Sequence, residues 1–343
     1  MYKRQKLILL ALVSILIVVC IISLGLGAYF IPPKDIFSLL MQKTHLATAI
    51  PINSMHEDVI FEIRLPRLLL GILVGAALGI SGAAIQGIFR NPLAEPGLIG
   101  ISSGASLFAV MIIAFEALVF TSISAWIGYY VLAFGAFAGA GLTAFMVYRI
   151  ASKNGKPSVT TMLLAGIAIN AFAGALTGLM TYVSTEQQLR TITFWLLGSL
   201  GGATWDNLLA VAPFIIIPLI CLPFFGKSLN AFALGEMQAD LLGVQTDRIK
   251  RWVVVLSTLA VGASVAVSGI IGFVGLIVPH IIRLIGGADH RFVLPGSLLF
   301  GALALTLADV IARVSVAPIE LPIGVITALL GTPLFLYILI KEK

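Results

Sequence analysis

The run WVVVLSTLAVGASVAVSGIIGFVGLIVPHII occupies positions 252–282 and contains no charged side chain. As one helix, its 31 residues would be about 46 Å long, well over a bilayer hydrocarbon core of about 30 Å. Basic residues stand on both sides of it, so both of its ends are expected in the cytoplasm. The run therefore predicts two short, tilted helices that meet near the outer face, with a break within 268–272 and Pro279 in the second helix.

The composition excludes a soluble globular protein. Hydrophobic residues make up 59% of the 343 positions and charged residues only 10%, against about 25% in soluble chains, and the mean hydropathy is +1.10. Apolar runs of about 20 residues recur along the sequence, which predicts an all-α polytopic membrane protein. The net charge of +6 follows from basic cytoplasmic loops and predicts no nucleic-acid partner. Two single cysteines and four scattered histidines predict no metal site.

The charge distribution predicts about ten transmembrane helices in one permease domain, residues 1–343. With both termini cytoplasmic, 15 of the 21 Lys and Arg residues fall inside, and six outside: Lys34, Lys43, Arg64, Arg67, Arg190 and Arg313. The expected spans are about 7–31, 64–89, 98–119, 126–148, 158–183, 208–225, two within 252–282, 292–312 and 323–340. Residues 90–97 are expected to form a cytoplasmic turn.

Glycine spacing and an internal similarity suggest how the spans pack. Glycines four apart (Gly71, Gly75 and Gly79; Gly135 and Gly139; Gly174 and Gly178) are expected to bring helices into close contact. VGAALGISG at 74–82 matches VGASVAVSG at 261–269, and the two copies enter the membrane from opposite sides. This predicts an inverted internal repeat, which is typical of transporters. Chance similarity between two glycine-rich helices is the alternative.

Charged residues near the expected helix ends have two explanations each. Arg64, Arg67 and Arg313 stand at outer helix ends, where they could anchor the chain in the membrane or form bidentate pairs with carboxylates of a docking protein. Asp309 is an intramembrane acid, which makes it a candidate for proton-coupled secondary transport. It also stands one helical turn before Arg313, so an internal ion pair is the simpler explanation.

The segment LNAFALGEMQADLLGV at 229–244 interrupts the apolar pattern with a short amphipathic stretch. It lies between two expected spans on the cytoplasmic side, with Gly235 before Glu236 and Gly243 near its end. One interpretation is a helix lying on the bilayer surface. The other is a plug that fits a cleft on a separate, soluble motor subunit.

Several blocks of the sequence resemble the FecCD-type permeases, the membrane subunits of bacterial importers for vitamin B12, ferric siderophores and haem. The resemblance runs over essentially the whole chain. The blocks are RLPR at 64–67, SGAAIQGIFRNPLAEPGLIGISSGA at 81–105, LLAGIAIN at 163–170, the segment at 229–244, GFVGLIVPHIIRL at 272–284, DHR at 289–291 and ELPIGVITALLGTPLF at 320–335.

The resemblance implies the architecture of a type II ABC importer permease. Expected partners are a second copy of the chain around a central path, two ATPase subunits on the cytoplasmic side, an extracytoplasmic substrate-binding protein and membrane lipid. The chain is then no enzyme and binds no cofactor directly; ATP and Mg²⁺ belong to the ATPase, and haem or a metal chelate is the cargo. The expected location is the bacterial cytoplasmic (inner) membrane.

The resemblance also assigns roles to particular positions. A coupling loop at about 227–250 is expected to form two short helices that seat in the ATPase, through Leu229, Leu234, Gly235, Glu236, Ala239, Leu242 and Gly243. The binding protein is expected to dock on Arg64, Arg67 and Arg313. A cytoplasmic gate is expected at Asn91, Pro92, Leu93, Thr160 and Thr161.

The stretches TY at 181–182, QLRTITFWLLGSL at 188–200 and GATW at 202–205 resemble the haem branch more than the others. A substrate path is expected at Tyr182, Arg190, Phe194 and Trp195, because an arginine could meet haem propionates while aromatic rings offer flat apolar surface. The same side chains could instead pack the corner between the fifth and sixth spans. A ferric siderophore or vitamin B12 remains the alternative cargo.

Overall fold

The computed structural model describes residues 2–27, 29–43, 54–119, 125–153, 156–316 and 319–341. Within these residues, seven helical segments are long and apolar enough to cross a membrane, and three shorter apolar helices accompany them, which confirms the all-α membrane architecture. The ten helices are α1 Lys3–Gly25, α4 Leu65–Phe89, α5 Ile101–Val119, α6 Ala125–Ala151, α7 Val159–Tyr182, α9 Trp205–Cys221, α12 Thr246–Ser268, α13 Val274–Gly286, α14 His290–Val314 and α15 Ile323–Lys341.

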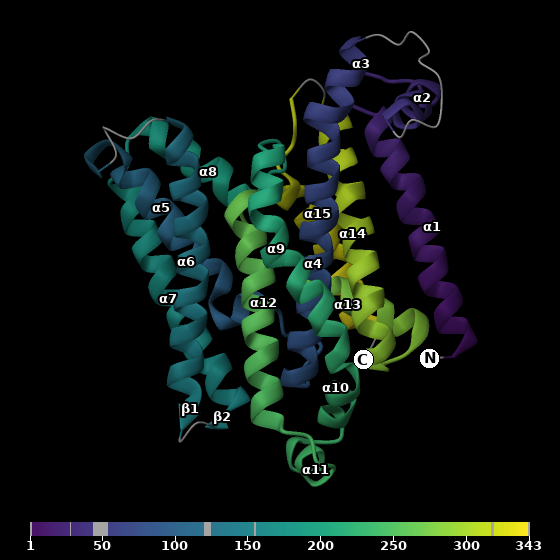
Figure 1. Ribbon diagram of the computed structural model, residues 1–343. Coiled ribbons are helices and arrows are strands. Elements are labelled where there is room, and N and C mark those ends of the chain that lie inside the picture. Colours follow the sequence, from purple (N-terminus) through teal and green to yellow (C-terminus); the bar gives the residue numbers. More distant parts are fainter. Residues whose placement is uncertain are drawn as a thin grey trace.

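Short elements gather at the two ends of this bundle (Figure 1). At one end lie α2 Pro33–Lys43, α3 Ser54–Asp58 with the π-helical turn Val59–Arg64, and α8 Glu186–Leu197. At the other end lie the antiparallel strands β1 Ser152–Lys153 and β2 Lys156–Pro157, the 3₁₀ turn Leu222–Phe225, α10 Gly226–Ala233 and α11 Glu236–Leu241. A further 3₁₀ turn, Pro96–Ile99, precedes α5.

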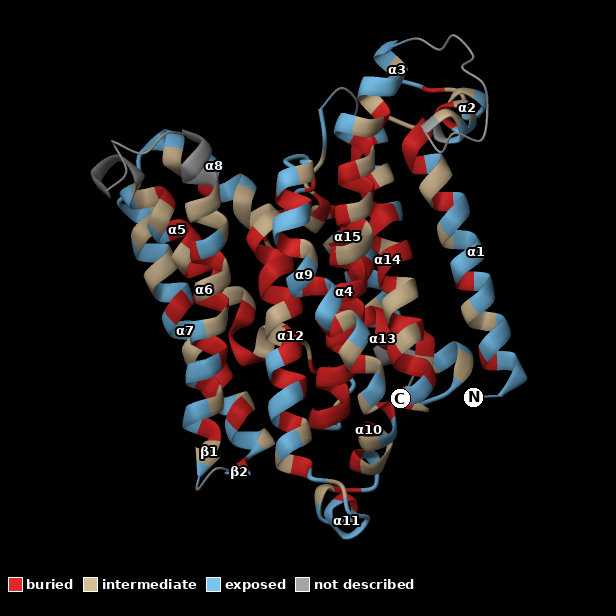
Figure 2. Ribbon diagram, viewed as in Figure 1, coloured by how far each residue is buried: buried red, intermediate tan, exposed pale blue. Residues whose placement is uncertain are grey.

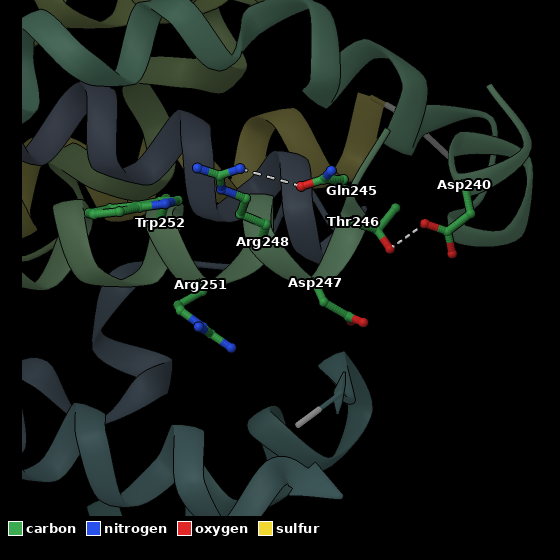
Figure 3. A pocket seen from close by; sticks show the side chains of 7 residues that line it. All are labelled: Asp240, Gln245, Thr246, Asp247, Arg248, Arg251 and Trp252. Carbon is green, nitrogen blue, oxygen red and sulfur yellow. Dashed lines mark hydrogen bonds between the residues drawn. The ribbon is translucent and has the colours of Figure 1, made fainter. Parts of the chain in front are cut away.

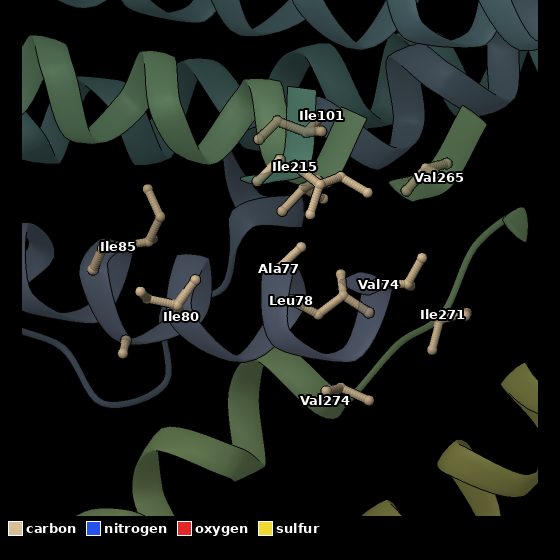
Figure 4. Close-up of a cluster of buried hydrophobic side chains, with 14 of the residues drawn as sticks. Val74, Ala77, Leu78, Ile80, Ile85, Ile101, Ile215, Val265, Ile271 and Val274 are labelled. Atoms are coloured by element: carbon tan, nitrogen blue, oxygen red, sulfur yellow. The ribbon is translucent and has the colours of Figure 1, made fainter. Parts of the chain in front are cut away.

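Helix α4 forms the centre of the bundle. Of its 25 residues 21 are buried, and it packs against α14, α12, α13 and α9. Figure 4 shows its side chains, such as Val74 and Leu78, meeting Ile215 of α9 and Val265 of α12. Helices α1 and α7 show the opposite pattern, with long exposed faces in Figure 2. A helix that is apolar and exposed needs lipid or another protein to cover it.

The expected close packing at glycines is confirmed within the chain at some positions, and at others no described residue of the same chain is the neighbour. A Cβ on Gly75 would overlap the carbonyl of Gly301, and one on Gly79 would overlap that of Ser297, so α4 and α14 meet backbone to backbone. Gly139 of α6 meets α5 in the same way. In contrast, a Cβ on Gly174 or Gly178 would have no described neighbour within 4 Å, because this face of α7 contacts no other described helix.

The uncharged run at 252–282 breaks where the sequence predicts. Helix α12 ends at Ser268, and the left-handed conformations of Gly269 (φ +66°) and Phe273 (φ +68°) turn the chain into α13. The prediction of two short helices is wrong for the first, because α12 begins at Thr246 and its 23 residues are about 34 Å long. The helix extends through Lys250 because that charge is neutralised inside the protein. Only α13, with 13 residues, is short.

The two copies of the internal similarity run in opposite directions. Helix α4 begins at the α3 end of the bundle, whereas α12 begins at the α11 end (Figure 1). The local structures diverge at the last glycine of each copy. Gly82 lies inside α4, while the matching Gly269 terminates α12. The repeat is therefore inverted in direction and incomplete in secondary structure.

We predict that Gly75→Ala destabilises the protein and Gly141→Ala does not. The new methyl group on Gly75 would press on the backbone of α14, a type of overpacking that costs about 1–3 kcal/mol. A Cβ on Gly141 of α6 meets only open space, so its better helix propensity should leave stability equal or slightly raised. Thermal unfolding in detergent measures both. Equal melting temperatures for the two variants would contradict the packing described here.

Candidate functional site

The segment at residues 229–244 forms two short helices, α10 and α11, at the tip of the bundle (Figure 1). Gly235 (φ +122°) and Gly243 (φ +82°) supply backbone conformations that other residues rarely adopt, and they set the two turns. Leu229, Phe232 and Ala239 are buried and attach the segment to the bundle. A second set of apolar side chains points away from it, with exposed fractions of 65–83%: Leu234, Met237, Leu241 and Leu242.

A buried lysine holds α11 in place. Lys250, in the second turn of α12, is only 1% exposed. Its ammonium group donates to the carboxylate of Glu236 on α11 and to the carbonyl oxygen of Pro157 at 2.7 Å, and it forms an ion pair with Asp247 at 3.1 Å. An ammonium group has three N–H donors, so all three are satisfied by protein. One side chain thus joins α11, α12 and the residue that precedes the N-cap of α7.

A second set of polar contacts fixes α10. The Asn230 amide donates to Asp289 at 2.7 Å and accepts from the backbone N–H of His290 at 2.8 Å, which attaches α10 to the start of α14. Hydrogen bonds from the Arg291 side chain hold the pKa of Asp289 well below its ordinary value. The Thr246 hydroxyl donates to Asp240 at 2.6 Å, so the last turn of α11 is also attached to the start of α12. The segment at residues 229–244, called the coupling segment below, is therefore anchored at both ends.

The structure brings two of the expected gate positions together with the coupling segment. Asn91 and Thr160 line one cavity of about 480 Å³, and Glu236 and Lys250 line it too. Asn91 accepts a hydrogen bond from the Leu93 N–H at 2.9 Å, which closes a tight turn after α4. Leu93 is half-exposed, and the backbone N–H of Thr161 donates to the N-cap Ser158. Pro92, Leu93 and Thr161 are near this cavity in sequence but are not among its lining residues.

At the opposite end of the bundle, the three arginines expected to dock a binding protein are buried, with 6–7% exposure. Arg67 bonds Asp309 at 2.9 Å and Glu320 at 2.8 Å, and Arg313 lies 3.0 Å from Asp309, so the predicted Asp309–Arg313 pair is confirmed. Arg64 donates to backbone carbonyls at the end of α1, including Gly25 at 3.0 Å. These guanidinium groups are thus bound inside the chain, and their docking role stays a prediction.

The expected substrate-path residues lie at the corner between α7 and α8. Thr185 and Gln188 form a capping box that starts α8 directly after α7. Tyr182 is 87% exposed, and Arg190 and Phe194 are exposed as well. Trp195 is half-buried and packs against the hydrophobic core, so it holds the corner in place. Three of the four side chains are exposed and Trp195 is partly buried, and the substrate role of all four stays a prediction.

Two residues of this region are not evident from the sequence. The charge pattern predicts only a cytoplasmic position for Lys250, and its one local signal is the i, i+3 spacing from Asp247. Glu95 was placed on a cytoplasmic turn, but residues 90–100 turn back into the bundle. There Glu95 lines a cavity of about 360 Å³ with Leu78 of α4, Ser103 of α5 and Asn170 of α7. In the sequence, only Pro92 and Pro96 indicate that the chain turns at this position.

No group of His, Cys, Asp or Glu side chains among the residues described could hold a metal ion. The region combines three features: the exposed apolar side chains of α10–α11, polar contacts from these helices to the starts of α12 and α14, and the cavity lined by Asn91, Thr160 and Glu236.

Comparisons with known proteins identify the family of this chain. Residues 15–341 match the model of the FecCD transport family. The hemin transport system permease protein HmuU of Yersinia pestis is 45% identical over 292 residues, which cover 85% of this chain and 86% of that protein. The cobalamin import system permease protein BtuC of Halobacterium salinarum is 42% identical over 283 residues, covering 82% and 73%.

The fold also matches a solved transporter. A metal-chelate type ABC transporter in an inward-facing conformation superposes with a TM-score of 0.84 at 34% sequence identity, covering 98% of this chain and 99% of the other. This chain therefore belongs to the FecCD transport family and is an ABC importer permease.

Proposed function

We propose that two copies of this chain form the translocation path for haem in an ATP-driven importer of the bacterial cytoplasmic membrane, with both termini in the cytoplasm. An extracytoplasmic binding protein delivers the haem, and two separate ATPase subunits bind the α10–α11 tips. The observation that carries this proposal is the exposed apolar surface of α10–α11, joined through Lys250 to the start of α7. The alternative, a helix that lies on the bilayer surface, does not account for the link through Lys250 to the start of α7.

The connection supplies a route from nucleotide to gate. When the ATPase subunits close, they move α11, and Glu236 pulls on the Lys250 ammonium. Because Lys250 also holds the carbonyl of Pro157, the force reaches the backbone three residues before Thr160. Asn91, on the turn after α4, lies across the shared cavity, so motion of the α7 start changes the opening between them. In this mechanism α11 and the start of α7 move together, and their contacts through Lys250 carry the coupling between the ATPase and the gate.

The choice of haem rests on the corner between α7 and α8 and on the similarity to HmuU. Arg190 can pair with a propionate, and Tyr182 and Phe194 present exposed aromatic surface beside it. Several relatives are named as vitamin B12 permeases, at 39–42% identity, so a corrinoid is the second candidate. Secondary transport through Asp309 is disfavoured because both of its carboxylate oxygens are occupied by arginines.

A homodimer would cover surface that is bare in one copy. Helix α7 exposes Leu164, Phe172 and Leu179, and Gly174 and Gly178 on it have room for a close neighbour. Small residues four apart allow two helices to approach closely in a membrane. A second copy packed along α7 would place the gate residues of both copies beside a common axis.

Transport by the reconstituted complex tests the proposal directly. In vesicles that contain the permease, its ATPase and the binding protein, we expect ATP-dependent accumulation of haem and little of vitamin B12 or a ferric siderophore. Vesicles that lack only the ATPase should accumulate nothing. Accumulation of B12 in preference to haem would overturn the cargo, and accumulation without the ATPase would overturn the importer mechanism.

Glu236→Gln tests the coupling route. The substitution removes the charged contact to Lys250 and leaves the contacts to Asp247 and Pro157, so the fold should persist. We expect the number of haem molecules moved per ATP to fall at least about fivefold, the shift that about 1 kcal/mol of coupling produces. ATPase binding, measured by copurification, should remain. Asp206→Asn, an exposed acid in the first turn of α9 at the opposite end of the bundle, serves as the control; equal transport by both variants would contradict the route.

The two acidic partners of Arg67 should differ in their effect on stability. Asp309 is 4% exposed and faces two buried arginines, so Asp309→Asn should lower the free energy of unfolding by about 3 kcal/mol or more. Glu320 is 44% exposed, so Glu320→Gln should cost about 1 kcal/mol or less. Thermal unfolding of the two variants in detergent gives the comparison. A larger loss for Glu320→Gln would mean that the buried cluster does not hold this end of the bundle together.

A further inference from the structure

A groove between α6 and α12 has no role in the transport mechanism above. It encloses about 530 Å³ and is lined mainly by carbon, from Phe137, Gly141 and Phe145 on α6 and Val255 and Leu259 on α12. The ring of Phe137 packs against Phe214 of α9 at a centroid distance of 5.4 Å, which closes the groove at its inner end. A Cβ on Gly141 would meet nothing within 4 Å, so the middle of the groove is open.

The other end of this groove is basic. Arg149 and Arg251 both line it, together with Tyr148, whose hydroxyl accepts a hydrogen bond from Arg251 Nε at 3.3 Å. The nearest acid along α12 is Asp247, one turn away, but its carboxylate is paired with Lys250. Within the described part of the chain Arg149 has no ion pair. Two guanidinium groups therefore line the mouth of an apolar groove, and no carboxylate is among the residues that line it.

Trp252, next to Arg251 in the sequence, indicates the level in the membrane at which the basic end of the groove lies. Trp252 is 46% exposed, and Figure 3 shows it on the same side of α12 as Arg248, while Arg251 and Asp247 project from another side. Tryptophan in membrane proteins concentrates at the level of the lipid headgroups. The arginines thus lie where a phosphate of the cytoplasmic leaflet would lie, and the groove extends from there toward the membrane centre.

We propose that this groove binds one anionic phospholipid, with its phosphate on Arg149 and Arg251 and an acyl chain along Gly141. Guanidinium groups suit phosphate because they donate pairs of hydrogen bonds, and basic pockets between transmembrane helices on the cytoplasmic side bind anionic headgroups. The combination of two cations with a carbon-lined groove fits a molecule with a phosphate and a chain better than a free anion. Because α12 carries Lys250, the lipid would brace the helix that holds the coupling segment.

Native mass spectrometry of the purified protein tests the site, with phosphatidylglycerol and phosphatidylethanolamine of identical chains as probes. We expect one phosphatidylglycerol to be retained in preference, and at least about tenfold less of it on Arg149→Gln/Arg251→Gln. Lys3→Gln/Lys6→Gln removes two exposed cations from the expected cytoplasmic end of α1 and should change nothing. Gly141→Leu fills the groove without altering charge and should also release the lipid, whereas Ala11→Leu, on the exposed face of α1, should not.

The outcomes separate the proposal from its rivals. Unchanged retention in Arg149→Gln/Arg251→Gln, or an equal loss in Lys3→Gln/Lys6→Gln, overturns the site. Retention by Gly141→Leu, or binding of glycerol phosphate as tight as that of the lipid, overturns the role of the groove. If Gly141→Leu instead converts a dimer into monomers, the groove is an interface between copies. Circular dichroism confirms that each variant is folded before its lipid is measured.

Discussion

The contacts of the Lys250 ammonium group are the interaction on which the α10–α11 end of this permease depends. Burying an unpaired charge costs several kcal/mol, so the side chain is stable only while protein oxygens surround it. Those oxygens come from three separate segments: Glu236 on α11, Asp247 on α12 and Pro157 before α7. None of the three can move far without leaving the charge uncompensated. Under the proposed mechanism, this electrostatic constraint makes the three segments move together and couples the apolar tip to the expected gate residues.

At the opposite end of the bundle, buried charges are again compensated by partners from separate helices. Asp309 lies between Arg67 of α4 and Arg313 of its own helix α14, and Arg313 also bonds Ser23 of α1 at 2.7 Å. The cluster thus ties three helices at the end opposite to the coupling segment. Between the two polar clusters, α4 and α14 meet through glycine backbones, which allows little relative motion. The starts of α7 and α12 are joined to α11 through Lys250, so under the proposed mechanism they move with α11.

Much of the fold could be predicted from the sequence. Apolar run lengths and basic flanks gave ten spans, and the glycines at 269 and 272 gave the break between α12 and α13. The α10–α11 pair followed from resemblance. Lys250 and Glu95 could not be placed from the sequence because a charged residue was taken to mark the membrane surface. Lys250 is inside α12 and Glu95 returns into the bundle, since the first is surrounded by protein oxygens and the second lines a cavity. The burial of Arg64, Arg67 and Arg313 also depends on partners within the protein. Such partners come from distant segments and cannot be read from local pattern.

The most direct test of the account measures distances by pulsed electron spin resonance in the assembled transporter. Spin labels at Met237 on α11 and Lys153 on β1 report whether the tip and the hairpin before α7 move together, and labels at Lys153 and Leu93 report the gate. On ATP binding, the account predicts an unchanged Met237–Lys153 distance and a changed Lys153–Leu93 distance. A changed Met237–Lys153 distance with a constant Lys153–Leu93 distance would contradict it.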